Sequence, residues 1–491
     1  MSESTSKQLK NTAKNTAIYA VGTSIRRITG FVMLPIYTQY LTPEDYGVVS
    51  LLTMVIEIAG VLIGLRISQA LFRYYILSET EDEKKKIVSS VLISVFVVST
   101  VGMAIIYFFS GALASIIFGT IKYQYELQLF SSTLMLNALI AVGLSYIRAR
   151  QKPVIFVSIG VISLVLQVVL NIIFVVVLEM HVRGVIYSAI ISSFIIAITL
   201  VTYVLSRVGV CYSRIVVIKL YKFITPLMFA ALGAIYVSYA DKYFLRVYSG
   251  LTDVGLYTLA VRVCSVLAVA AEAFNLSWGV DRYEVAKMHN AREIYNYFFR
   301  LFSVVLVTIS AGIVLFADNL FFAMTEPAFY PAASIVPILT MAAIIRIYTV
   351  YCNFGLLYKE KTKHMAEASW LKAVIATIGF VALIPAIGII GAATAIMLAN
   401  LFEFMWVNKL AIRYYDMELK WQPVVLMYLT GVSFLFCGSF ISGVGLVDFI
   451  LKLVIYMGLI AFLYFMPIWK DDERELLKAS LNKAINYRTK S

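Results

Sequence analysis

Long apolar stretches recur along almost the whole chain, and short polar segments separate them. An α-helix needs roughly 20 mostly apolar residues to cross the hydrocarbon core of a bilayer. The pattern predicts about fourteen transmembrane helices by this criterion. They cover approximately residues 16–38, 45–67, 87–110, 127–147, 153–178, 184–206, 221–245, 251–278, 296–317, 331–357, 364–386, 388–408, 423–443 and 446–468.

Basic residues alternate between the connecting segments, as the positive-inside rule predicts for a membrane protein. With the N-terminus in the cytoplasm, 31 of the 41 Lys and Arg residues lie in or near cytoplasmic segments, and only five lie in or near segments on the opposite side. The alternation predicts an even number of spans with both termini in the cytoplasm. It also accounts for the net charge of +13 without a nucleic-acid partner.

The composition is that of a polytopic membrane protein. Of the 491 residues, 61% are hydrophobic and 14% are charged, whereas charged residues make up about 25% of an ordinary soluble domain. A soluble enzyme, a secreted protein and a disordered protein are therefore poor interpretations. The predicted fold class is all-α.

No pattern of a catalytic, nucleotide-binding or metal site is present in the sequence. The connecting segments are too short for a nucleotide-binding domain, and no GxxxxGK[ST] occurs. The histidines His181, His289 and His364 lie in separate loops, and the four cysteines form no CxxC pair. We expect no enzyme activity, no cofactor and no metal. Coupling of transport to H⁺ or Na⁺ stays open.

A weak internal repeat divides the chain. Residues 45–51 (DYGVVSL) open the second predicted span, and residues 253–259 (DVGLYTL) open the eighth, at an offset of 208 residues. The basic turns 148–152 and 359–363 correspond as well. An offset of six helices gives both repeats the same orientation. We predict helices 1–6 over residues 1–217, helices 7–12 over 218–418, and helices 13–14 with a cytoplasmic amphipathic tail over 419–491.

Charged side chains inside the predicted spans are the main candidates for function, because each costs about 2.5–3.5 kcal/mol at the centre of a membrane helix on insertion scales. We expect them to face a water-filled cavity or a partner rather than lipid. Cations in both repeats indicate an anionic ligand between them, and arginine matches phosphate oxygens best. The candidate binding residues are Arg26, Arg27, Arg262 and Arg346.

Further charged residues have two interpretations, as structural ion pairs or as groups at an entrance or in ion coupling. Arg66 and Arg73 lie seven residues apart on one face of the second span, where they either anchor the helix or gather phosphate. Asp241 and Lys242 can neutralise each other. The candidates for an entrance or for coupling are Arg66, Arg73, Lys372, Glu57, Asp241 and Glu272, and Glu403 is a further carboxylate in a span. A surface helix is also expected over 281–295.

The sequence resembles the polysaccharide transporter family, the Wzx-type O-antigen flippases. The resemblance is carried by Leu34-Pro35, by Leu41-Thr42-Pro43-Glu44-Asp45-Tyr46-Gly47 and by the stretch from Ala70 to Tyr75. Pro226-Leu227, Asp241-Lys242 and residues 254–257 (VGLY) fit as well, so that the resemblance extends over about residues 15–412. The hairpin motif is typical of the wider superfamily of multidrug, oligosaccharidyl-lipid and polysaccharide exporters.

The resemblance implies two pseudo-symmetric six-helix lobes in a V, with two additional C-terminal helices. It implies a flippase in the bacterial cytoplasmic (inner) membrane that works by alternating access. Its substrate would be an undecaprenyl-diphosphate-linked oligosaccharide for surface polysaccharide, O-antigen and lipopolysaccharide biosynthesis. In that interpretation the four candidate arginines hold the diphosphate or anionic sugars. The implied partners are the lipid-linked oligosaccharide, membrane lipids and the proteins that polymerise and assemble the polysaccharide.

Two other functions stay open from the sequence. A cation-coupled drug or metabolite antiporter of the same superfamily would need an acidic site within one lobe, whereas the candidates here are mostly cationic. A membrane-embedded glycosyltransferase or polymerase would need a large extracytoplasmic loop with catalytic groups, and no predicted outer loop is long.

Overall fold

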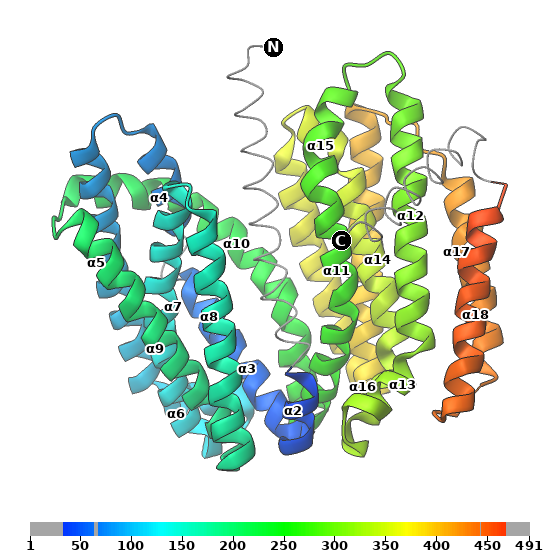
Figure 1. Cartoon of the computed structure of the whole chain (residues 1–491), viewed down its shortest axis with the longest axis horizontal. Coiled ribbons are helices and arrows are strands. Elements are labelled where there is room, and N and C mark those ends of the chain that lie inside the picture. Colours follow the sequence, from blue (N-terminus) through cyan, green and yellow to red (C-terminus); the bar gives the residue numbers. More distant parts are fainter. Residues whose placement is uncertain (1–32, 63–66, 442, 468–491) are drawn as a thin grey trace, which may run out of the picture. The chain divides into compact units, whose positions relative to one another are not determined.

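The computed structural model describes residues 33–62, 67–441 and 443–467, and every regular element among them is a helix (Figure 1). This confirms the all-α expectation. The elements of the first part of the chain are α2 Leu34–Tyr40, α3 Pro43–Leu62, α4 Ile67–Leu77, α5 Glu81–Phe108, α6 Ser110–Phe118, η1 Ile121–Tyr123, α7 Gln124–Ala149, α8 Pro153–Asn171, η2 Ile172–Val177 and α9 His181–Val208. The later elements are α10 Arg214–Tyr248, α11 Leu251–Val285, α12 Ala291–Leu315, α13 Ala317–Met324, η3 Pro327–Ile335, α14 Val336–Cys352, α15 Phe354–Tyr358, α16 Thr362–Tyr414, α17 Trp421–Ser439 and α18 Leu446–Phe465.

These elements form two compact units. Unit 1 consists of the described residues up to Ala273 together with Leu320–Tyr415. Unit 2 consists of Phe274–Asn319 and the described residues from Asp416 onwards. Helix α12 therefore belongs to the same compact unit as α17 and α18. The predicted boundaries between the sequence repeats, at residues 217 and 418, stay a prediction.

Eleven helices among the described residues are long and apolar enough to cross a membrane. One of them, α16, has 53 residues, which is far more than one crossing needs. It reverses at Ile387 and Gly388, where Gly388 has a φ of +57°, a backbone conformation that favours glycine. Lys372 then lies 2.8 Å from Glu403 on the opposite limb. Since the limbs pack against each other, α16 accounts for two predicted spans. The total of fourteen stays a prediction.

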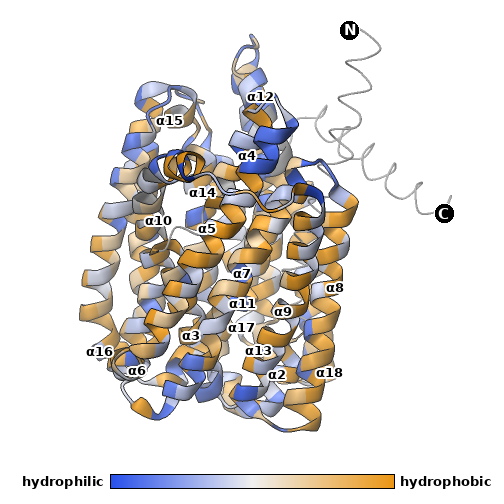
Figure 2. Cartoon of the chain, turned by 90° about the vertical axis from the view of Figure 1, so that its left-hand side faces the viewer, coloured by the Kyte–Doolittle hydropathy of each residue, from blue (hydrophilic) through white to orange (hydrophobic). Residues whose placement is uncertain are grey.

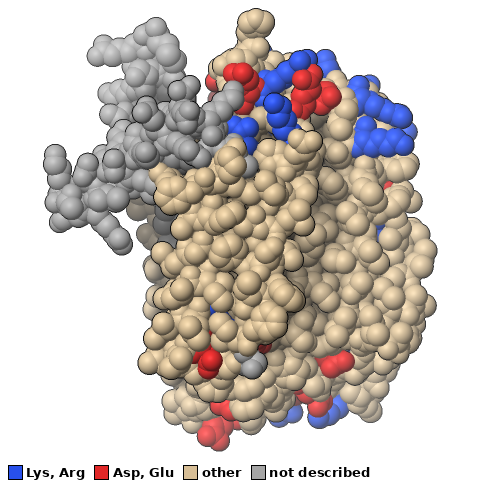
Figure 3. Space-filling model, turned by 90° about the vertical axis from the view of Figure 1, so that its right-hand side faces the viewer, with Lys and Arg blue, Asp and Glu red and all other residues tan. Residues whose placement is uncertain are grey.

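Polarity is distributed along the helices as a bilayer requires. In Figure 2 the middle parts of the helices are mostly apolar, and polar residues gather towards the helix ends. Figure 3 shows most of its Lys and Arg side chains at one end, further charged side chains at the other end, and a broad stretch of mostly uncharged residues between them. Large apolar side chains such as Phe108, Val177 and Leu446 are exposed. Apolar exposure of this kind marks a surface that lipid rather than water covers.

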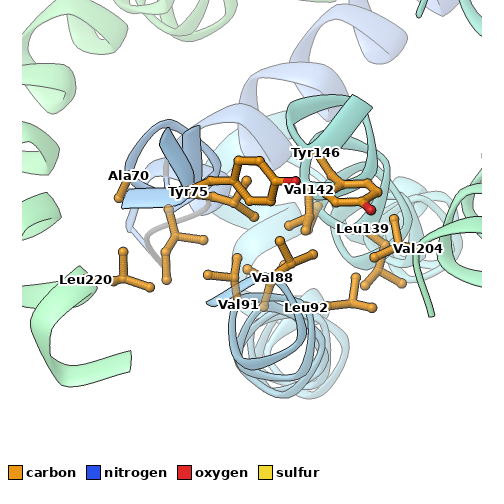
Figure 4. Close-up of a cluster of buried hydrophobic side chains, with 14 of the residues drawn as sticks. Ala70, Tyr75, Val88, Val91, Leu92, Leu139, Val142, Tyr146, Val204 and Leu220 are labelled. Carbon is orange, nitrogen blue, oxygen red and sulfur yellow. The ribbon is translucent and has the colours of Figure 1, made fainter. Parts of the chain in front are cut away.

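An apolar cluster holds the helices α4, α5, α7 and α9 together, and Leu220 and Ile224 of α10 join it (Figure 4). Val88 and Val91 are completely buried there. The rings of Tyr75 and Tyr146 meet edge to face, with their centroids 6.0 Å apart. Lipid tails are as apolar as these side chains, so close packing rather than exclusion of water stabilises the cluster. We call these four helices the N-terminal bundle.

Local sequence signals fix the start of α5. The Thr80 hydroxyl accepts a hydrogen bond from the backbone N–H of Glu83 at 3.3 Å. Three acidic residues in the first turn stabilise the start of the helix, because their negative charges lie at the positive end of the helix dipole. A hydrogen bond from Lys84 lowers the pKa of one of them, Glu81. The helix therefore begins where the sequence places an N-cap.

The separate surface helix expected over 281–295 is wrong. Instead α11 continues to Val285 and α12 begins at Ala291, so the two long helices extend past the apolar region and a short turn joins them. The charged residues of this stretch extend the long helices because no glycine or proline stops the helix before the turn. The predicted tail helix lies outside the described residues.

Unit 2 packs α12 against α17 and α18. Val307 and Ala311 of α12 meet Met427 of α17 and Leu459 of α18, all buried. The segment before α17 is fixed by Asn296, whose side-chain amide donates to the carbonyl of Glu418 at 3.0 Å and accepts from the N–H of Lys420 at 2.7 Å. The unit is thus held at its apolar middle and at one end.

Candidate functional site

Helices α3 and α11 bring the two copies of the sequence repeat into contact. A Cβ added to Gly47 would lie 3.2 Å from the backbone nitrogen of Gly255, and one added to Gly255 would lie 3.1 Å from the nitrogen of Gly47. One turn further on, the Thr258 hydroxyl donates to Oγ of Ser50 at 3.0 Å. Each pair is separated by 208 residues, which is the offset of the repeat. Equivalent positions of the two repeats therefore face each other.

Arg262 follows on the same face of α11, seven residues after Gly255. Its guanidinium carbon lies 5.5 Å from the centroid of the Tyr46 ring, a cation–π contact. It also interacts electrostatically with Tyr37 of α2. At about 1.5 Å per residue, Arg262 lies about 16 Å along α11 from its first residue. The structure thus places this predicted binding residue in mid-span, against α3 and about two turns further along α11 than the contact of the repeats.

Lys372 and Arg346 form a second cationic group, within α14 and α16. Lys372 is buried and ion-paired with Glu403 at 2.8 Å, and Ser369 contacts the same carboxylate. Arg346 is exposed on α14 and repels Lys372 electrostatically. A buried charge that is fully paired is a structural element. Of the two cations, Arg346 is therefore the one that a ligand could reach.

Asp241 is a buried carboxylate near the end of α10. It accepts a hydrogen bond from the N–H of Lys242 at 2.8 Å, and the hydroxyl of buried Tyr257 is hydrogen-bonded to it. The ammonium of Lys242 lies 5.0 Å from the centroid of the Tyr239 ring and attracts Asp241 electrostatically. The structure brings these four residues of α10 and α11 together as a partly neutralised group.

Of the other predicted site residues, Glu57 interacts electrostatically with Tyr239 of the Asp241 group. Arg73 is exposed on α4 and lies over the Phe223 ring at 4.7 Å, which suits an anchoring role as well as an entrance. Glu57 of α3 and Glu272 of α11 are exposed. Arg26, Arg27 and Arg66 lie outside the described residues.

Sequence reasoning missed two buried polar contacts. Glu126, in the first turn of α7, is paired with Arg183 of α9 at 2.9 Å. Lys452 of α18 is almost completely buried and donates to Asn319 at 2.9 Å. In both cases the available signal was a single charge at the edge of an apolar run, which does not reveal its partner.

No group of three or more His, Cys, Asp or Glu side chains that could hold a metal ion occurs within residues 33–62, 67–441 and 443–467. The arrangement offers fixed positive charge at the contact of the repeats and one accessible cation on α14. This is suited to binding an anion reversibly.

The fold is that of integral-membrane flippases and transporters. The structure of the lipid II flippase MurJ in an inward closed conformation matches with a TM-score of 0.72 and 14% identity, over 91% of this chain and 99% of that one. An inward-facing multidrug MATE transporter matches with a TM-score of 0.60 and 15% identity, over 82% and 99% of the two chains. A mutant of the Vibrio cholerae MATE transporter VcmN matches with 0.59 and 16%, over 85% and 99%.

The chain belongs to the polysaccharide biosynthesis protein family, whose pattern matches residues 12–275. This confirms the resemblance found in the sequence. No individual curated protein matches significantly. The similar structures are a flippase and transporters rather than enzymes, which agrees with the expectation for this chain.

Proposed function

We propose that this chain is a flippase that translocates a polyprenyl (undecaprenyl)-diphosphate-linked oligosaccharide across the bacterial cytoplasmic membrane, for surface polysaccharide or O-antigen biosynthesis. Family membership supports a role in polysaccharide biosynthesis, and the fold shared with a lipid II flippase supports movement of a lipid-linked molecule. Transport proceeds by alternating access, with the sugar headgroup between the two repeats and the lipid tail in the bilayer.

The observation that carries the proposal is the position of Arg262. It lies in mid-span beside the contact between the repeats, where a neutral substrate would need no cation. Its guanidinium rests on the Tyr46 ring, and the planar guanidinium fork is the side-chain group that matches phosphate oxygens best. Arg346 adds an accessible cation from the second repeat, and Arg26 and Arg27 are the candidates from the first span.

The chain's orientation is part of the proposal, with both termini in the cytoplasm. The starts of α3 and α11 and the segment around Phe329 lie at one end of unit 1, since Gly47 contacts Gly255 and the Tyr46 ring packs on Phe329. This end faces outward in the proposed topology. Membrane-impermeant thiol labelling should therefore reach cysteines placed at residues 249–253 or 319–330 from outside, and those at 79–86 only from the cytoplasm. Labelling of 319–330 from the cytoplasm alone would contradict the topology.

Complementation of a strain that lacks its own flippase tests the function. Arg262→Ala should abolish export of the polysaccharide at normal protein level. Arg262→Lys should recover little, because lysine keeps the charge but loses the planar fork that matches phosphate. Arg207→Ala is the matched control, since Arg207 also rests on a tyrosine ring, Tyr203 at 4.9 Å, but in the last turn of α9. Full export by an alanine variant at Arg26, Arg27, Arg262 and Arg346 together would reject the anion-binding role.

The second candidate is a cation-coupled antiporter, and one observation favours it. Asp241 is a buried carboxylate in the membrane region, hydrogen-bonded to Tyr257, and MATE transporters share the fold. In the flippase proposal the same carboxylate is the candidate for H⁺ or Na⁺ coupling. Asp241→Asn should then lower polysaccharide export. If it instead removes resistance to cationic drugs and leaves export unchanged, the antiporter interpretation is correct.

A further inference from the structure

A pocket lies at one end of the N-terminal bundle, where the end of α4, the start of α5 and the end of α7 meet. Its volume is about 380 Å³, and it is lined by Tyr75, Glu81, Ala149, Arg150 and Gln151. None of the mid-span charged groups described above lines it. Helices α4, α5, α7 and α8 all begin or end within a few residues of these positions. The pocket is therefore at the end of the apolar, membrane-spanning segments.

The cation of the pocket is Arg150, which directly follows the last residue of α7. Its guanidinium donates a hydrogen bond to the hydroxyl oxygen of Tyr75, and the negative charge of Glu81 attracts it. A guanidinium carries five N–H donors in a planar fork that matches phosphate oxygens. Its contact with one hydroxyl therefore leaves Arg150 able to bind a phosphate group as well.

The turn after α7 fixes the position of this side of the pocket. The N–H of Lys152 donates to the carbonyl of Ile147 at 3.2 Å, and the N–H of Gln151 donates to that of Arg148 at 3.0 Å. These two bonds form a Schellman motif, whose left-handed residue is usually glycine. Here that residue is Gln151, with a φ of +53°. A position that most helices give to glycine thus adds an amide side chain to the lining of the pocket.

The anion of the pocket is Glu81, the first residue of α5. Its Oε1 accepts a hydrogen bond from the ammonium of Lys84 at 2.9 Å, one turn further along the same helix. A carboxylate has two oxygens and about four lone-pair sites, so Glu81 can accept from a second cation. The lining of the pocket therefore offers one positive and one negative group to the same ligand.

The pocket borders a surface of exposed apolar side chains. Ile76 and Leu77, which follow Tyr75 in α4, are 56% and 64% exposed, and Val154 in the first turn of α8 is 65% exposed. Tyrosine next to apolar residues at the end of a span is typical of the level at which lipid headgroups lie. A ligand in this pocket can therefore keep apolar chains in the bilayer.

We propose that this pocket binds the headgroup of a zwitterionic phospholipid, a phosphoethanolamine group whose phosphate contacts Arg150 and Gln151 and whose ammonium contacts Glu81. Charge complementarity selects this headgroup, because its one negative and one positive charge match the one cation and one anion of the lining. A purely anionic headgroup would place a phosphate beside Glu81 without a compensating ammonium. The site is independent of the transported substrate, and the proposed orientation places it in the cytoplasmic leaflet.

Competition between two lipids tests the site in the purified full-length protein. The protein in detergent is mixed with equal amounts of palmitoyl-oleoyl phosphatidylethanolamine and phosphatidylcholine, and native mass spectrometry measures which lipid is retained first. Methylation of the ammonium in phosphatidylcholine removes the N–H donors to Glu81. We expect the ethanolamine lipid to be retained roughly tenfold more often, the effect of one charge-assisted hydrogen bond. Equal retention of the two lipids would overturn the proposal.

Two substitutions in the pocket have matched controls. Glu81→Gln should abolish the preference for the ethanolamine lipid, whereas Asp82→Asn, at the next residue of α5 and outside the lining, should keep it. Arg150→Gln should lower retention of both lipids, because both carry the phosphate. Arg148→Gln should not, since that guanidinium rests on the Phe72 ring at 5.9 Å. Equal losses in a pocket variant and its control would contradict a site at these residues.

Soluble phosphoethanolamine distinguishes a membrane lipid from a free phosphate ester. It carries both charges of the headgroup but no acyl chains, so at millimolar concentration it should leave the retained phosphatidylethanolamine almost unchanged. Complete displacement of the lipid at that concentration would assign the pocket to a soluble phosphate ester and reject the lipid. None of these measurements uses polysaccharide export, so failure of the lipid site and failure of the proposed flippase function are separate results.

Discussion

The α3–α11 interface and the core of the N-terminal bundle are both helix contacts in unit 1, but they are built in opposite ways. In the bundle, branched and aromatic side chains such as Val88, Leu92 and Tyr146 interdigitate and are almost fully buried (Figure 4). At the α3–α11 interface, two glycines let backbone meet backbone, a hydroxyl pair adds a hydrogen bond, and Arg262 of α11 packs on the Tyr46 ring of α3. A jigsaw core has one low-energy arrangement, whereas a contact of smooth backbones can separate. The comparison distinguishes a contact of small residues from a core of interlocked side chains.

The substitutions Gly255→Leu and Gly143→Leu should show the difference between the two kinds of helix contact most clearly. In α7 a Cβ on Gly143 would lie 2.9 Å from Cβ of the buried Leu200, so Gly143→Leu overpacks the bundle and should lower stability by about 1–3 kcal/mol or more. Gly255→Leu places a Cβ on the backbone carbonyl of Pro43, so it should push α3 and α11 apart and abolish export while the bundle core stays packed. Export assays and thermal unfolding in detergent measure both. A Gly255→Leu protein that unfolds earlier than Gly143→Leu would reverse the assignment.

The Lys372–Glu403 pair inside α16 should behave as a structural contact. Lys372→Met leaves the half-buried Glu403 carboxylate without its partner ion, and breaking a fully buried pair costs about 3–5 kcal/mol, which is the upper limit here. Replacing both residues, with Glu403→Leu in addition, should restore most of the melting temperature. Restored stability together with lost export would show that the pair also serves transport.

Leu92 tests the rigid core without changing charge. It is 4% exposed within the cluster of α4, α5, α7 and α9. Leu92→Ala should destabilise the protein by about 2–5 kcal/mol through the cavity that it leaves. Export per folded molecule, obtained by comparing transport with the amount of folded protein, should stay constant. A change in transport per molecule would show that the bundle itself deforms during the cycle.

The smallest effect is expected at the N-cap of α5. Thr80→Ala removes the hydroxyl that accepts from Glu83 and should cost about 1 kcal/mol. Thr80→Ser keeps the cap and is the control. A small drop in melting temperature for alanine alone, with normal export, would be consistent with a rigid bundle whose helix ends do not take part in transport.

The amino-acid sequence by itself determined the class of protein, the approximate spans and the family. These depend on composition and on patterns of about 20 residues, and each span is apolar enough to be recognised before it packs. The sequence also showed the repeat that carries Gly47 and Gly255, and it pointed to Arg262 and Asp241 as costly charges.

Only the tertiary structure decided which of these residues meet. A 208-residue separation does not reveal that two equivalent glycines touch, since a parallel repeat is compatible with adjacent or distant copies. The ion pair of Lys372 with Glu403 depends on the reversal at Gly388, and the burial of Lys452 depends on Asn319 lying beside α18. The physical reason is that hydrophobicity selects the membrane segment, whereas the choice of neighbour depends on shape and on polar partners that lie far apart in the chain.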